Sequence, residues 1–166
     1  GMDMRKIHTG LPQLIVKVLT AIVLSDMNDF EFDSDKQEET WKSIEEQNHF
    51  RKKMEKALKE ILYIGDGAFK VTIDTAVSEY PGLEWYPGER IEIIYQRDRV
   101  HEVIFKTPYD VKGRRYVLNE RYGYGYIINE LYLDEKLVDL KVLEQTGDLT
   151  DWQFDRKIIL AVPVYV

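Results

Sequence analysis

The pattern of hydrophobic and polar positions from Asn48 to Asp74 changes period once, and this change predicts a helix followed by a strand. Up to Ile64 the apolar residues recur at steps of three and four, as on a helix with one apolar face. From Phe69 the period is two, which is typical of a strand with one buried face. The glycines of Gly65-Asp66-Gly67 suit a helix end, because glycine adopts left-handed backbone conformations without a Cβ clash. The apolar positions are Phe50, Met54, Ala57, Leu58, Ile61 and Leu62 in the helix and Phe69, Val71 and Ile73 in the strand.

Two more helices are expected before this segment. Pro12 suits the first position of a helix and precedes an apolar run at residues 14–24. The run is shorter than the roughly 20 residues that cross a bilayer, so a core or subunit-contact helix is favoured over a membrane span. Ser34 and Gln37 have the spacing of a capping box for a short second helix, and Asn48 is a candidate N-cap of the third. The candidate subunit-contact residues are Leu14, Val18 and Ile22.

The remainder of the chain alternates short strand-like segments with turn signals, which predicts an antiparallel meander. Strands are expected at residues 90–96, 100–106, 114–120, 123–133 and 137–143. The predicted fold class is α+β, with N-terminal helices packed on one face of a mainly antiparallel sheet. We expect one domain, residues 2–166, with a helical part at about 11–64 and a sheet part at about 68–166.

Composition narrows the classes of function. The 166 residues are 44% hydrophobic and 32% charged, which is ordinary for a globular domain. The net charge of -7 argues against non-specific nucleic-acid binding over the whole surface. The absence of cysteine excludes a disulfide framework and a thiolate nucleophile within this sequence. Gly1, before Met2, looks like a residue left by cloning.

No motif predicts catalysis or metal binding. His8, His49 and His101 are scattered rather than spaced as metal ligands on a helix. The acidic segment 25–34 departs from the EF-hand pattern, so a solvated loop or short edge strand is favoured over a calcium site. Glu38 and neighbouring glutamates suit a solvated helix face better than an acid–base pair. We therefore expect no catalytic residue, no cofactor and no metal.

Tyrosines form the most suggestive surface. Tyr124, Tyr126 and Tyr132 share one face of the expected strand at 123–133. Such a row could stack on sugars or bases, which leaves open a non-catalytic module that binds a glycan or another extended polymer. Tyrosines also pack well on half-buried sheets, and this interpretation is favoured.

Three segments in a fixed order carry a family resemblance. LPQLIVKVLTAIVLSD, NHFRKKMEKALKEILYIGDGAFKV and RVHEVIFKTPY...GRRYVLNERYGYGYIINELYL resemble the N-terminal, wing portion of portal (head-to-tail connector) proteins of tailed phages of Gram-positive hosts. The resemblance extends from Leu11 to Leu143. It depends on the order of the segments rather than on any single motif.

The resemblance implies a structural virion subunit rather than an enzyme. Portal proteins of this family form a ring, typically of twelve subunits, at one capsid vertex, and DNA passes through the ring without base-specific contacts. Terminase and head-completion proteins are the implied partners, and no membrane is involved. The implied location is the virion, and the host cytoplasm during assembly, with a prophage as a further source of the gene. Family members are several hundred residues long, so we expect this chain to be part of a longer portal protein.

Overall fold

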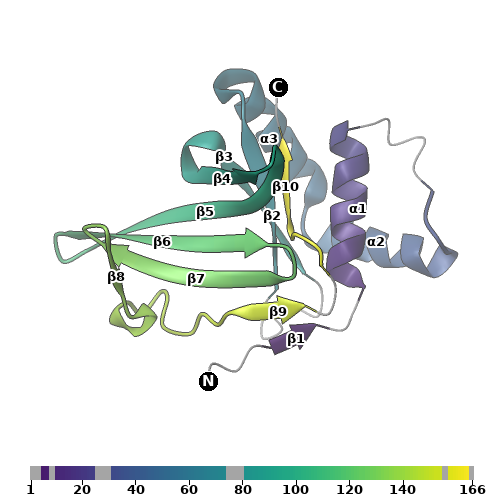
Figure 1. The fold of residues 1–166 in the computed structure, drawn as a ribbon. Helices are drawn as coiled ribbons and strands as arrows, with labels where there is room; N and C mark the ends of the chain where they lie inside the picture. Colours follow the sequence, from purple (N-terminus) through teal and green to yellow (C-terminus); the bar gives the residue numbers. More distant parts are fainter. Residues whose placement is uncertain (1–4, 8–9, 25–30, 74–80, 155–156, 165–166) are drawn as a thin grey trace. The chain divides into compact units, whose positions relative to one another are not determined.

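The computed structural model describes residues 5–7, 10–24, 31–73, 81–154 and 157–164, which form two compact units (Figure 1). The helical unit contains Thr9–Glu89 and Leu160–Val166, and the sheet unit contains Gly1–His8 and Arg90–Ile159. The predicted α+β class with antiparallel sheets is confirmed. The single domain at residues 2–166 stays a prediction.

Three helices and a three-stranded antiparallel sheet make up the helical unit. The helices are α1 (Leu11–Leu24), α2 (Asp35–Gln47) and α3 (Phe50–Ile64). The sheet has the order β10 (Ala161–Val164), β2 (Gly67–Thr72), β3 (Gly82–Pro87). Helix α1 contacts β10 and β2, and α3 contacts β3. The prediction that helices pack on an antiparallel sheet is confirmed, and within this unit that sheet is the one formed by β10, β2 and β3, because the predicted sheet part divides into two sheets.

The predicted junction from helix to strand is confirmed. Helix α3 ends at Ile64, Gly65 has a φ of 99°, and β2 begins at Gly67. The one-sided burial predicted for this strand is wrong, because β2 is the central strand and Lys70 is only 3% exposed. The Lys70 ammonium donates to the Tyr86 hydroxyl at 2.8 Å and pairs with Glu84 at 3.1 Å. These contacts replace the hydrogen bonds to water that the Lys70 ammonium group loses on burial.

Side-chain hydrogen bonds define the ends of α2. The predicted N-cap is confirmed, because the Ser34 hydroxyl accepts a hydrogen bond from the Gln37 amide. The N-cap predicted at Asn48 is wrong, since this residue caps the C-terminal end of α2 instead. The Asn48 side chain donates to the Pro81 carbonyl at 3.1 Å and accepts from the Leu83 amide at 3.0 Å. Asn48 thereby connects the end of α2 to the start of β3.

The sheet unit is a curved meander extended by two short strands (Figure 1). Its order is β1–β9–β7–β6–β5–β4, with β8 paired to β7; among the strands that the structure describes here, β1 and β9 run parallel and the other pairs are antiparallel. Most of its length lies in the antiparallel series β4, β5, β6 and β7. The strands are β1 (Arg5–Ile7), β4 (Ile91–Gln96), β5 (Arg99–Val111), β6 (Arg114–Gly123), β7 (Tyr126–Leu133), β8 (Lys136–Val138) and β9 (Trp152–Phe154).

Two of the strands predicted for this unit are interrupted, while β5 and β6 extend beyond their predicted ends at residues 106 and 120. The segment 123–133 is not one strand, because Tyr124 and Gly125 form the turn between β6 and β7, where Gly125 has a φ of 87°. The segment 137–143 divides into the end of β8 and the short 3-10 helix η3 (Leu140–Val142). Leu140 and Leu143 pack on the sheet against Tyr116, Leu118 and Leu131. Helix η3 therefore belongs to a segment that covers one face of the sheet.

Candidate functional site

A polar network crosses the three longest strands of the sheet unit. Glu102 lies on β5, Arg121 on β6, and Tyr126 and Glu130 on β7. Cross-strand pairing places all four side chains on one face of the sheet. Arg121 Nη2 lies 3.0 Å and 3.1 Å from the two carboxylate oxygens of Glu102, and Nη1 lies 3.3 Å from Glu130 Oε1. The Tyr126 hydroxyl donates to Glu102 Oε2 at 2.5 Å.

Burial explains why the network is so tightly paired. The Glu102 side chain is 4% exposed, whereas those of Glu130 and Arg121 are 21% and 35% exposed. A carboxylate removed from water is costly unless donors replace the water, and Arg121 and Tyr126 supply them at both oxygens of Glu102. The arrangement therefore fixes the register of β5, β6 and β7. It leaves neither Glu102 oxygen without a hydrogen-bond donor.

The Tyr126 hydroxyl of this network is expected to lose its proton at a higher pH than an exposed tyrosine does. Burial, followed by the hydrogen bond to Glu102 and its negative charge, raises the pKa of Tyr126 to about 12. The folded state therefore holds this proton more tightly than the unfolded chain, whose tyrosine titrates near pH 10. The resulting stabilisation is fully present below pH about 10 and is lost as the pH rises through about 12.

A ¹³Cζ NMR titration of the tyrosines tests this expectation. One resonance should shift near pH 12, and it should be missing from the Tyr126→Phe variant. The variant should also lose less stability than the wild type between pH about 10 and about 12. A Tyr126 resonance that titrates near pH 10 would contradict the described hydrogen bond to Glu102.

The predicted tyrosine row is not formed by one strand. Tyr124 lies in the turn and is 47% exposed, so its placement on a common strand face with Tyr126 and Tyr132 is wrong. Tyr126 and Tyr132 do share a face of β7, but the Tyr126 hydroxyl is engaged with Glu102. Burial, then the charge of Glu130 and a hydrogen bond to it, raises the pKa of Tyr132. Use of these rings for polymer binding stays a prediction.

The candidate subunit-contact residues lie on α1. Leu14 is 3% exposed and Val18 is fully buried, so both belong to the core of the helical unit. The side chain of Ile22 lies outside the described residues. A second subunit could reach Leu14 and Val18 only if this core opened, and their role as a subunit contact stays a prediction.

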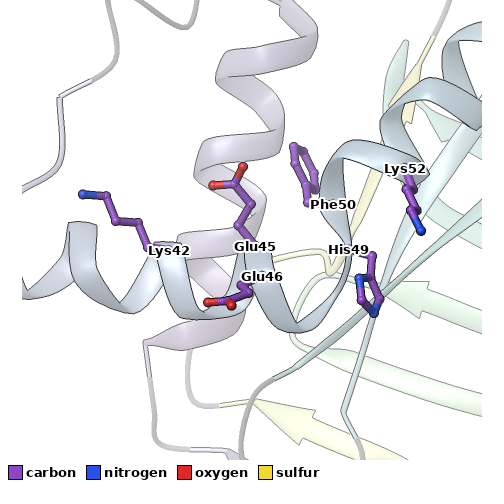
Figure 2. Close-up of a pocket in the computed structure, with 6 residues that line it drawn as sticks. All are labelled: Lys42, Glu45, Glu46, His49, Phe50 and Lys52. Atoms are coloured by element: carbon purple, nitrogen blue, oxygen red, sulfur yellow. The ribbon is translucent and has the colours of Figure 1, made fainter.

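A shallow depression of about 450 Å³ lies where α2 ends and α3 begins. It is lined by Lys42, Glu45, Glu46, His49, Phe50 and Lys52 (Figure 2). Figure 2 shows Glu45 and Glu46 leaving α2 on opposite sides and Lys42 and Lys52 pointing away from each other. Acid–base catalysis needs groups that converge on one reacting atom, and the charged side chains drawn here diverge.

Metal-ligating side chains do not gather in the ranges that the structure describes. Within them, no group of three or more His, Asp or Glu residues could hold a metal ion. His49 lines the shallow depression, His101 is exposed on β5, and His8 lies outside the described residues. Among the helices described, none has the length and apolar character needed to cross a membrane.

The polar network was not predicted from the sequence. Glu102 and Arg121 are 19 residues apart and meet only through the register of β5 and β6. The sequence shows that Glu102 and Ile104 alternate with Val103 and Phe105, which assigns these side chains to sheet faces but does not identify their partners.

Neither a protein-family model nor a curated protein matches the chain. By its fold and this network, the chain is an α+β protein with a cluster of ion pairs on one face of an antiparallel meander.

Proposed function

We propose that the chain is the wing-like part of a phage portal subunit, a structural component of the ring through which DNA is packaged and ejected. The supporting observation is the order of the elements. Helices α1, α2 and α3 precede a glycine junction and β2, and the β5–β6–β7 meander follows. These elements fall on the three segments that resemble portal proteins, in the same order.

The physical properties of the chain suit a scaffold. The central strand β2, the Asn48 connection and the Glu102–Arg121 pair all hold elements in fixed positions. The net charge of -7 suits a subunit of a ring through which DNA must slide without adhering, because phosphate retention requires clustered lysine and arginine. We further propose that the chain belongs to a longer polypeptide, whose partners are terminase and head-completion proteins.

Size-exclusion chromatography with multi-angle light scattering tests the proposal on the complete gene product. A closed oligomer with a single mass, twelve subunits by the family resemblance, is the expected result. A protein that remains monomeric as its concentration is raised would rule out the proposed function. The 166-residue chain, run in parallel, shows how much of the association lies within this part.

A further inference from the structure

One end of the sheet unit carries exposed positive charge. The turn from β4 to β5 lies at this end and contains Arg97, and Arg99 begins β5; both side chains are exposed. Lys157 is exposed at the same end, because the carbonyl of the next residue, Ile158, accepts a hydrogen bond from Gly125 in the turn from β6 to β7. Within the described part of the chain, none of these three cationic side chains is held in an ion pair.

The carboxylates near this end do not neutralise the three cations. Asp98 lies in the turn between the two arginines and supplies one negative charge. Glu102 lies further along β5, but both its oxygens accept hydrogen bonds from Arg121, and one also accepts from Tyr126. Among the described residues of this end, the positive charge of Arg97, Arg99 and Lys157 is therefore in excess.

The opposite end of the same strands has no such excess among its described residues. The turn from β5 to β6 contains the exposed cation Lys112, and Arg114 follows it, but Arg115 pairs with Asp110. The neighbouring turn from β7 to β8 contributes two exposed carboxylates, those of Asp134 and Glu135. Cations and carboxylates thus alternate at this end, and it provides matched control positions.

Exposed rings lie among the cations of the first end. Tyr124, in the turn from β6 to β7, is 47% exposed. Glu102 pairs with Gly123, so the next residue on each strand, His101 and Tyr124, lie beside each other. His101 is the extra residue of a β-bulge opposite β4, and it is exposed. We name the following set the basic end: Arg97, Arg99, His101, Tyr124 and Lys157.

We propose that the basic end binds single-stranded nucleic acid. Phosphates complement the three cations, and a base can stack on the exposed ring of Tyr124. A single strand fits better than a duplex, because only unpaired bases offer their faces to a ring. Acidic peptides would complement the charge, but a carboxylate offers no flat surface for stacking. The proposal goes beyond the ring subunit function and does not require it.

Fluorescence anisotropy with the 166-residue chain tests the charge contacts. The probe is a labelled oligothymidylate of about 20 nucleotides, longer than one small domain covers. Three phosphate contacts predict a slope of about -2 for log K against log salt concentration, and joint Arg97→Ala and Arg99→Ala substitution should reduce it to about -0.7. Affinity at low salt should fall by about tenfold or more.

Two further sets of variants serve as controls. Joint Lys112→Ala and Arg114→Ala substitution removes the same charge at the opposite end, and should change the affinity by less than about twofold. Tyr124→Ala should weaken binding by about fivefold or more, whereas Tyr124→Phe should retain the affinity because it retains the ring. Circular dichroism verifies that each variant folds.

The outcomes that would overturn the proposal are distinct. No rise in anisotropy up to about 0.1 mM protein at low salt would exclude binding. Equal losses from the arginine pair and from the Lys112 and Arg114 pair would exclude this location. Unchanged affinity of Tyr124→Ala, or competition by polyglutamate as strong as by unlabelled oligothymidylate, would exclude a stacked single strand. None of these results bears on ring formation, so the proposed function is tested separately.

Discussion

Replacement of Phe105 by alanine is expected to lower the free energy of unfolding by about 3–5 kcal/mol, the largest effect we expect of any single substitution considered. Phe105 lies on β5 in the interior of the sheet unit and has no exposed surface. Its ring meets the Tyr122 ring edge to face, with centroids 5.1 Å apart. Alanine would remove this contact and leave a cavity against the face of the sheet, whose hydrogen-bonded strands cannot readily move to fill it.

Urea denaturation followed by circular dichroism measures the effect of Phe105→Ala. Tyr124→Ala is the control, because a 47% exposed turn residue should change the free energy of unfolding by about 0.5 kcal/mol or less. A loss below about 1 kcal/mol for Phe105→Ala would mean that this face of β5 is not the core of the sheet unit.

Arg121→Leu is expected to destabilise the sheet unit by about 3 kcal/mol, since it leaves the Glu102 carboxylate buried without its guanidinium partner. We place the effect at the lower end of the range because the Arg121 side chain is 35% exposed and water reaches part of the pair. Arg121→Lys should cost less, because it retains the charge and loses only the paired geometry at the two Glu102 oxygens.

A second substitution separates charge burial from packing. In the Arg121→Leu background, Glu102→Gln should recover part of the lost stability, because a neutral amide is less costly to bury than a carboxylate. Urea denaturation of the four proteins gives the coupling between the two positions. If Glu102→Gln lowers the stability of Arg121→Leu further, the network does not owe its strength to the ion pair.

Local patterns were sufficient to predict some features of the fold. The change of period at Gly65 predicted the end of α3 and the start of β2, and the Ser34–Gln37 spacing predicted the N-cap of α2. In each case a few neighbouring residues determine the backbone conformation, so the signal lies within one short window.

Features that depend on neighbours in space could not be predicted. Lys70 occupies a position that alternation assigns to solvent, yet it is buried, and the side chains of Glu84 and Tyr86 on the neighbouring strand β3 contact its ammonium group. The turn at Tyr124-Gly125 was missed because glycines and tyrosines alternate there as in a strand. The Glu102–Arg121 pair requires the register of two strands, which no local pattern specifies.

We propose that this chain is part of a subunit that assembles into a portal ring. Electron microscopy of the purified complete gene product tests it most directly, because class averages display rotational symmetry and a central channel without any assumption about mass. Closed rings with an open channel and one dominant symmetry are the expected result. A field of single, unassociated particles at concentrations where portal proteins form rings would contradict it.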